Sequence, residues 1–348
     1  MEKMYVGLDV HKETINMAVV DCHGKVVKEA KFLNTIQSLD HFLGGMQPET
    51  EFALEACGFY EPIYDWIDDR GYNVTLAHPL KVKAIASAKI KTDTIDARTL
   101  AQLKRVDLLP ASFVPPKHVR EVRSIVRHRA SMVRQRSHIK HCIHAVLHRE
   151  GIKQPFSDLF GKAGIEWLKK VPLKLSNRFS VDNYLAIHNA MTEKIELVSI
   201  QIQGLVNANP NVARLTSMPG IGAYSALLIA TEIGDVKRFP SADKLCAYAG
   251  LVPSVHQSAR TMRRGHITKE GNKLLRWILV EAAQKAGEHD PHLSKVYNRL
   301  KSRLGTNKAK VAIARKMLCY AYIMLTELRI HYAYREQRVS HVKCKLQR

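Results

Sequence analysis

MYVGLDVHKETINMAVVDCHGKVVKEAKFL (4–33) contains the pattern that predicts the fold of the first third of this 348-residue chain. Residues 4–10 and 15–21 are apolar, β-branched runs, and residues 25–33 alternate between apolar and polar positions. The dipeptide His23-Gly24 supplies a turn signal before the third run. Three strands joined by short turns predict an antiparallel meander.

Helix and strand signals alternate beyond the meander. In chain order, the pattern predicts a helix within 35–46, a strand at 51–56, a helix at 61–71, a strand at 73–79 and a helix at 93–105. This order is that of a ribonuclease-H-like fold, an α/β domain with a mixed sheet, here over residues 1–112. The alternation alone also suits other small α/β folds.

The rest of the chain is predicted to be mostly helical. After the Pro-rich link 107–116, apolar residues recur at helical spacing in 117–150 and again in 187–205, which predicts an antiparallel hairpin and a middle region of 113–208. Residues 209–335 contain further helices, with Ser241 as an expected N-cap. Residues 336–348 form a basic tail.

The composition excludes several classes of protein. No run of about 18 apolar residues is present, which argues against a transmembrane helix, and the N-terminus lacks the apolar core of a signal peptide. Six cysteines are scattered without a C-x-x-C pair, so neither a zinc cluster nor a disulfide framework is predicted. We expect a cytoplasmic protein with no membrane partner.

Charge is distributed unevenly along the chain. The net charge is +22, yet residues 1–112 carry 13 basic and 16 acidic residues, and the remainder carries 41 basic and 16 acidic ones. This balance indicates a polyanion-binding body attached to a domain with carboxylate chemistry. A generally basic surface is the plainer alternative.

Four acids stand out in the first domain: Asp9, Glu55, Asp93 and Asp96. Asp9 and Glu55 end apolar strands that are adjacent and parallel in a ribonuclease-H-like sheet, and Asp93 and Asp96 share one helix face. Converging carboxylates require cations, and oxygen donors favour Mg²⁺ or Mn²⁺ over Zn²⁺. Alternatively, Asp93 caps its helix and Asp96 is a solvated charge.

Two motifs lie in the C-terminal part. Gly220 and Gly222 shape a turn before a helix, typical of a helix-hairpin-helix phosphate site or of an ordinary interhelical turn. A polar loop is expected at 254–272, where Ser258 could attack a phosphodiester. Nearby cations would stabilise the developing charge: Arg260, Arg263, Arg264, Lys269 and Lys273. An ordinary loop serine is the alternative.

Basic residues are concentrated on the predicted helix after the link. Residues 117–153 hold ten Lys and Arg and six His against two acids, and residues 295–348 hold fourteen against two. Such stripes favour backbone contacts to duplex DNA or folded RNA, for which the candidates are Arg120, Arg123, Arg127 and Arg134. A solvated helix face is the alternative.

With these residues identified, the chain resembles the D-E-D-D transposases of bacterial insertion sequences, a bridge-RNA-guided family that is related to the Piv-type DNA invertases. The motifs that carry the resemblance are YVGLDVHK (5–12), LEACGFY (54–60), KTDTIDARTLA (91–101), MPGIGAYSALLIATEIGD (218–235) and the stretch 248–283. The resemblance covers the chain from about residue 4 to residue 290.

The resemblance implies a domain similar to the Holliday-junction resolvase RuvC, with the four acids binding Mg²⁺, and no nucleotide cofactor. It places the nucleophile at Ser258, followed here by Ala259 where the family usually has Gly, with Ser254 as the fallback. It implies a coiled coil that assembles dimers and tetramers, with composite sites between protomers. Its partners would be donor and target double-stranded DNA and a structured guide RNA.

Two other functions remain open. The first is a metal-dependent nuclease of the junction-resolving kind, in which Ser258 is structural and no covalent intermediate forms. The second is a nucleic-acid-binding protein with a decayed site, against which the complete set of four acids argues.

Overall fold

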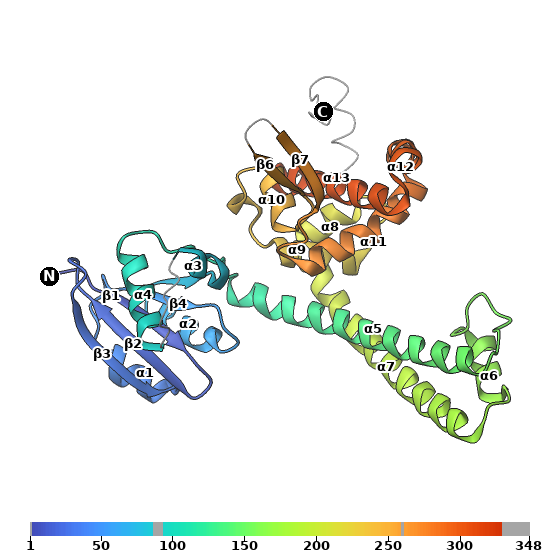
Figure 1. Cartoon of the computed structure of the whole chain (residues 1–348), viewed down its shortest axis with the longest axis horizontal. Helices are drawn as coiled ribbons and strands as arrows, with labels where there is room; N and C mark the ends of the chain where they lie inside the picture. Colours follow the sequence, from blue (N-terminus) through green and yellow to red (C-terminus); the bar gives the residue numbers. More distant parts are fainter. Residues whose placement is uncertain (1, 86–92, 259–260, 329–348) are drawn as a thin grey trace. The chain divides into compact units, whose positions relative to one another are not determined.

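The computed structural model describes residues 2–85, 93–258 and 261–328, without the side chains of 93, 94, 256–258 and 261–264. The chain forms two compact units, Met1–Val114 and Pro115–Arg348 (Figure 1). The division lies two residues beyond the predicted end of the first domain at 112. The predicted tail, 336–348, lies outside the described residues.

A five-stranded mixed sheet forms the centre of the first unit. Its strands are β1 (Tyr5–Val10), β2 (Thr14–Val20), β3 (Val26–Leu33), β4 (Glu51–Glu55) and β5 (Asn73–Ala77). The spatial order is β3-β2-β1-β4-β5, with β1, β2 and β3 antiparallel and β4 and β5 parallel to β1. The predicted meander and the mixed sheet are both confirmed.

Helices cover both faces of the sheet. The helices of this unit are α1 (Ile36–Leu43), α2 (Tyr60–Asp68), α3 (Pro79–Ile85) and α4 (Asp93–Arg105). Apolar residues of α1 and α2 form a core with Leu8, Phe52 and Leu54, whereas Leu100 of α4 packs on the opposite face against Ala53. The sequence pattern does not predict α3, because Pro79 indicates the end of the preceding strand. Proline is nevertheless well tolerated in the first turn of a helix, and α3 begins at this residue.

Two long antiparallel helices begin the second unit. They are α5 (Lys117–Arg149) and α7 (Leu175–Asn207), with the short α6 (Lys162–Lys170) between them. Arg129 Nε donates to Ser199 Oγ at 2.7 Å and Arg136 Nη1 to Thr192 Oγ1 at 3.3 Å, so the pairing runs in opposite directions, as predicted. The second helix begins twelve residues before the predicted residue 187.

The remaining helices surround a large apolar core. They are α8 (Pro210–Thr216), α9 (Ala223–Ile233), η1 (Val236–Arg238), α10 (Ala242–Tyr248), α11 (Lys273–His289), α12 (Pro291–Leu304) and α13 (Thr306–Thr326). The side chain of Ser241 accepts from Lys244 N at the start of α10, which confirms the predicted cap. The last eight residues of α9 are all buried, so this helix is the centre of the core.

The predicted polar loop at 254–272 is wrong for most of its length. Within it, β6 (Pro253–Ser258) and β7 (Thr261–Ile267) pair as an antiparallel hairpin. Val255, Thr261 and Ile267 are β-branched residues that favour strands, and Ile267 packs against the helical core. The many polar residues of this stretch hid the strand pattern.

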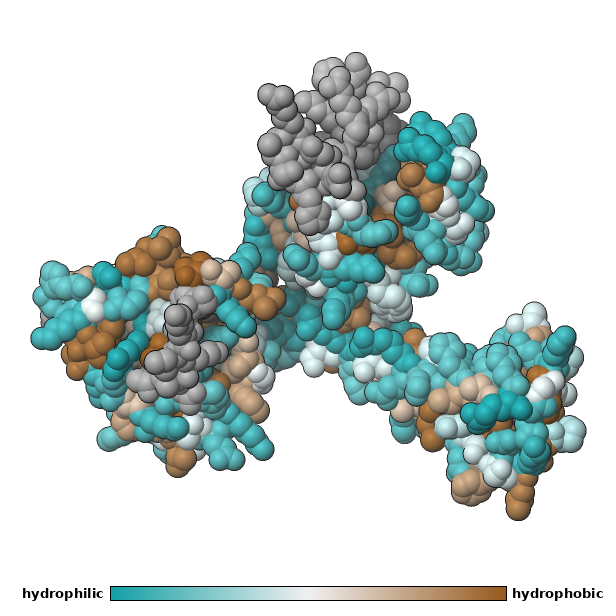
Figure 2. Space-filling model, in the orientation of Figure 1, coloured by the Kyte–Doolittle hydropathy of each residue, from teal (hydrophilic) through white to brown (hydrophobic). Residues whose placement is uncertain are grey.

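The described surface mixes hydrophilic and hydrophobic areas. Figure 2 shows hydrophobic side chains on the first unit and at the end of the α5–α7 hairpin where α6 lies. Exposed apolar residues in these places include Leu80, Leu108, Leu175 and Phe179. Among the described residues, no helix is both long enough and apolar enough to span a membrane.

Candidate active site

Two acids meet where β1 and β4 reach the same edge of the sheet. The strands are parallel, with Leu8 opposite Leu54, so Asp9 and Glu55 occupy the next register position. Paired residues of neighbouring strands point to the same face, so both carboxylates lie on one side of the sheet. Asp9 is only 6% exposed, and a carboxylate buried this far requires hydrogen bonds, a counter-charge or a metal ion.

Helix α4 lies directly on this face of the sheet. A Cβ atom at Gly7 would come within 2.7 Å of Ala101 N and would also clash with Ala97 O, so the missing side chain lets α4 contact β1. Gly7 and Asp9 are two residues apart on one strand and therefore share a face. The face that holds Asp9 is thus the face that α4 covers.

The direction of α4 places its first turn near the two acids. Its last turn is fixed at the opposite edge of the sheet, where Gln102 Nε2 donates to Gly24 O at 2.6 Å and Arg105 Nη1 donates to Cys22 O at 3.3 Å. These carbonyls belong to the turn that follows β2, beside the start of β1. The N-terminus of α4 therefore lies at the edge where β1 and β4 end.

The other two predicted acids belong to that first turn. Asp96 is half-buried and immediately precedes Ala97, which contacts Gly7. Asp93 is the first residue of α4, and its side chain lies outside the description. The structure thus brings Asp9, Glu55 and Asp96 to one end of the sheet, with the backbone of Asp93 one turn away.

The sequence pattern missed two residues of this site. His11 Nε2 lies 3.1 Å from Asp9 Oδ2, just beyond the end of β1. Burial raises the pKa of the Cys57 thiol, and the charges of Glu55 and Asp9 raise it further, so all three side chains share one environment. Both residues follow an acid by two positions, a spacing that could have indicated them.

The two candidate nucleophiles occupy different parts of the β6–β7 hairpin. Ser258 is the last residue of β6, opposite Thr261 at the tip, and its side chain lies outside the description. Ser254 lies near the base, where its Oγ fills the space that a Cβ at Gly265 would need. The Ser254 hydroxyl is therefore packed against Gly265 of the opposite strand, which gives it a structural role.

The predicted cations around Ser258 are distributed along the hairpin and beyond it. The backbones of Arg263 and Arg264 lie in β7, opposite His256 and Val255, and Arg260 lies outside the described residues. Lys269 and Lys273 are both exposed, Lys273 as the first residue of α11. Asn272 Oδ1 caps that helix by accepting from Leu275 N at 2.9 Å.

The glycine turn before α9 has a clear packing role. Gly220 has φ +82°, and a Cβ there would come within 2.6 Å of Ala282 O on α11. Gly222 is the exposed N-cap of α9. The turn therefore brings two helices into close contact, and its phosphate binding stays a prediction.

Two of the four predicted phosphate-binding arginines contact a buried glutamate. Glu232 of α9 is 1% exposed and accepts from Arg127 at 2.6 and 2.8 Å and from Asn272 Nδ2 at 2.6 Å. Arg123 lies 3.8 Å from the same carboxylate and donates to Thr231 O at 2.5 and 3.0 Å. These contacts join α5 to α9 and to the start of α11.

The glutamate is held in its charged form. Burial by itself raises the pKa of Glu232, but the hydrogen bonds and charge of Arg127, with Asn272 and Arg123, outweigh burial and lower the pKa below its usual value. Of the other two arginines, Arg120 donates to Pro115 O at 3.0 Å, and Arg134 is exposed on α5. Arg134 is the clearer candidate for contact with a phosphate.

Models of known protein families match both the segment that contains the four acids and the segment that contains the β6–β7 hairpin. Residues 212–298 match the model described as "Transposase IS116/IS110/IS902 family", and residues 6–151 match a transposase model of the D-E-D-D, IS110 type. The first range contains the β6–β7 hairpin, and the second contains all four acids.

Curated proteins similar to this chain cover nearly its whole length. The transposase for insertion sequence element IS1111A of Coxiella burnetii is 26% identical, over 92% of this chain and 89% of the relative. The transposase for IS1328 of Yersinia enterocolitica is 27% identical, over 92% and 96%. The pilin gene-inverting protein of Moraxella bovis is 26% identical, over 94% and 98%.

Proposed function

Because this chain belongs to the IS116/IS110/IS902 family of transposases, we propose that it is a DNA recombinase that cleaves and rejoins strands of an insertion sequence. The observation that carries the proposal is the buried Asp9 beside Glu55, beneath the first turn of α4. Relatives named as transposases and as pilin gene-inverting proteins support action on DNA.

In this proposal the first unit is a ribonuclease-H-like domain of the RuvC type. The sheet order β3-β2-β1-β4-β5 supports it, with the first three strands antiparallel and the next two parallel to β1. The position of α4 supports it too, because a helix that crosses β1 at Gly7 brings Asp96 to the edge where Asp9 lies.

The donor set suits a hard divalent cation. Asp9, Glu55, Asp93 and Asp96 would supply carboxylate oxygens, which Mg²⁺ and Mn²⁺ prefer. The burial of Asp9 beside a second acid supports this role, since adjacent carboxylates repel each other unless a cation neutralises them. Bound there, the ion would stabilise charge on a phosphodiester oxygen.

The serine of the β6–β7 hairpin is the proposed nucleophile. Ser258 Oγ attacks the DNA phosphorus and forms a phosphorus–Oγ bond as the bond to the departing DNA oxygen breaks; the serine proton passes to water, and the departing oxygen takes a proton from water to become a hydroxyl. The phosphoserine bond retains the energy of the broken linkage, so a DNA hydroxyl can later displace the serine without a nucleotide cofactor. The backbone positions of Arg263 and Arg264 in β7 support cationic stabilisation.

A covalent adduct on a denaturing gel tests this reaction. We expect an adduct between the full chain and labelled DNA, its loss in Ser258→Ala, and its retention in the matched control Ser254→Ala. If only Ser254→Ala loses the adduct, the nucleophile is Ser254. Cleavage without any adduct would instead support the metal-dependent nuclease, in which water attacks the phosphorus.

The nucleic-acid partners are proposed to be donor and target duplex DNA together with a structured guide RNA. The second unit carries most of the positive charge, and α5 presents exposed cations such as Arg134. Contacts of this kind neutralise phosphates without reading sequence, which suits recognition by RNA–DNA pairing.

The second copy in the proposed homo-oligomer has a candidate surface on α7. Leu175, Phe179, Leu197 and Ile200 are 89, 71, 50 and 65% exposed. They are separated by 4, 18 and 3 positions, close to whole helical turns, so they form one outward stripe, which the exposed Asp182 and Glu193 interrupt between Phe179 and Leu197. The stripe supports assembly through this helix into dimers and then tetramers.

Analytical ultracentrifugation tests the stripe. The pair Leu197→Glu and Ile200→Glu is expected to shift the chain toward monomer, whereas Gln203→Glu, an exposed neighbour on α7, is expected to leave assembly unchanged.

A further inference from the structure

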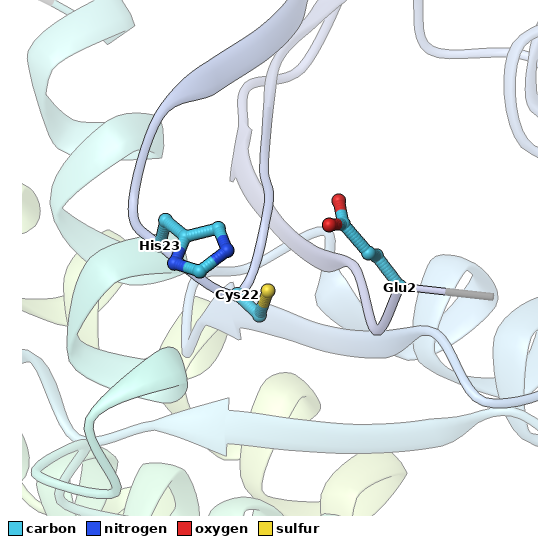
Figure 3. A group of neighbouring side chains, drawn as sticks. All are labelled: Glu2, Cys22 and His23. Carbon is cyan, nitrogen blue, oxygen red and sulfur yellow. The ribbon is translucent and has the colours of Figure 1, made fainter.

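Three donor side chains meet at the end of the sheet that is remote from Asp9. Glu2, Cys22 and His23 each offer one ligand atom, and these atoms all lie within 4.8 Å of one another (Figure 3). Glu2 precedes β1, and the other two follow β2. Because Tyr5 pairs with Val20 in antiparallel strands, these segments are neighbours in space although 20 residues separate them in sequence.

The turn that carries two of the donors is rigidly held. Asp21 Oδ1 accepts from His23 N and Lys25 N, both at 2.9 Å, and Asp21 O accepts from Gly24 N at 3.1 Å. Helix α4 secures the same turn through the contacts of its last turn with the carbonyls of Cys22 and Gly24. Two of the three ligands are therefore preorganised, which lowers the entropic cost of binding an ion.

We propose that Glu2, Cys22 and His23 form a binding site for a Zn²⁺-class ion. Thiolate, imidazole and carboxylate are the donors that zinc takes in proteins, and three protein ligands leave a fourth tetrahedral position open. One thiolate and one carboxylate balance a dication, so the loaded site is neutral. The thiol proton is released on binding, so the affinity rises with pH.

The site is distinct from the proposed catalytic carboxylates. Asp9 lies at the carboxyl end of β1 and Glu2 lies before its amino end, so the length of the strand separates them. Lys3, the neighbour of Glu2, pairs with Glu51 instead. A bound ion would link the segment before β1 to the β2–β3 turn, and this structural role is independent of the proposed reaction.

Cobalt provides a direct probe. The reduced, metal-free full-length chain is titrated with Co²⁺ alone, and the near-ultraviolet thiolate-to-cobalt charge-transfer band is recorded. We expect the band in the parent chain, its loss in Cys22→Ser, and an affinity about tenfold weaker in His23→Ala and in Glu2→Gln. Zn²⁺ is expected to bleach the band, and excess Mg²⁺ is not, because Mg²⁺ prefers oxygen ligands.

The matched control is Cys142→Ser. Cys142 lies 3.7 Å from His138 on α5 and offers an alternative thiol–imidazole pair. Retention of the band in this variant supports the proposal, and its loss there would overturn it. Absence of a band in the parent chain, or its persistence in Cys22→Ser, would overturn it equally. Because all three donors are exposed, we expect the variants to fold, which circular dichroism checks.

Discussion

Asp9 is a charged residue in a strand whose other residues from Val6 onward are buried. We expect Asp9→Asn to keep its size and its place in the sheet while losing the charge that would hold a metal ion. Strand cleavage in Mg²⁺ should fall about a thousandfold, equivalent to roughly 4 kcal/mol of transition-state stabilisation. A gel assay on labelled DNA measures this.

Glu55→Gln is expected to behave in the same way. The control is Glu13→Gln, an exposed carboxylate that follows β1 and should retain activity. Full cleavage by either acid variant would remove the carboxylates from the proposed reaction.

Gly7 determines how closely α4 approaches the sheet. In Gly7→Ala the new methyl group would meet the backbone of Ala97 and Ala101, which cannot rotate away. We expect a loss of stability of about 1–3 kcal/mol, typical of overpacking, together with weaker cleavage because Asp96 moves with its helix. Urea unfolding and the cleavage assay measure the two effects. Gly45→Ala, with open space around it, is the control, and equal stability of both variants would contradict the close contact.

At the scale of elements, Glu232 links α5, α9 and the start of α11. Glu232→Gln removes the charge that compensates Arg127 and Arg123, and we expect a loss of about 3 kcal/mol in the free energy of unfolding. Because the pKa of Glu232 is lowered in the folded chain, its contribution is present above the ordinary value of 4.5 and is lost as the pH falls through the folded value. Denaturant titrations from pH 7 to pH 3 should show that the free energy of unfolding depends less on pH in the variant than in the parent chain.

The stability of the α5–α7 hairpin around His188 should decrease in acid. His188 is buried, and burial with the charges of Lys140 and Arg136 lowers its pKa, as burial does for His144. The unfolded chain therefore binds protons first as the pH falls below 6.5, and stability decreases there.

His188→Leu is expected to reduce this loss, because an apolar side chain needs no proton in either state. Hydrogen exchange of the amides near 185–192 at pH 7.5 and pH 5.5 measures the difference. Equal acid sensitivity of parent and variant would exclude His188 as the cause.

At the scale of the whole molecule, the excess of positive charge predicts salt-sensitive binding. The logarithm of nucleic-acid affinity should fall linearly with the logarithm of salt concentration, and Arg134→Ala should reduce the slope by about one. Arg127→Met is the contrast, because its guanidinium is bonded to Glu232, so it should lower stability while leaving the slope nearly unchanged. A shallow slope for the parent chain would contradict phosphate binding.

Much of the architecture could be predicted from short-range patterns. The first two strands within residues 4–33 were recognisable as continuous apolar runs, because both of their faces are buried. The second long helix was recognisable because burial repeats about every 3.6 residues in a helix, and Ser241 because it is a residue type that caps helices. The carboxylates of Asp9 and Glu55 could be singled out because a charge inside an apolar run is costly without a partner.

Short-range patterns in the sequence were therefore sufficient to predict the mixed α/β unit, the helical hairpin, the charge asymmetry and the acids that we propose carry the chemistry. The folded structure was needed to show three further features: residues 253–258 pair with 261–267 as strands, Arg127 contacts Glu232 across 105 positions, and Glu2 lies beside Cys22. The physical reason is that periodicity records which face of an element is buried, whereas the partner that meets a given side chain depends on how distant segments fold together.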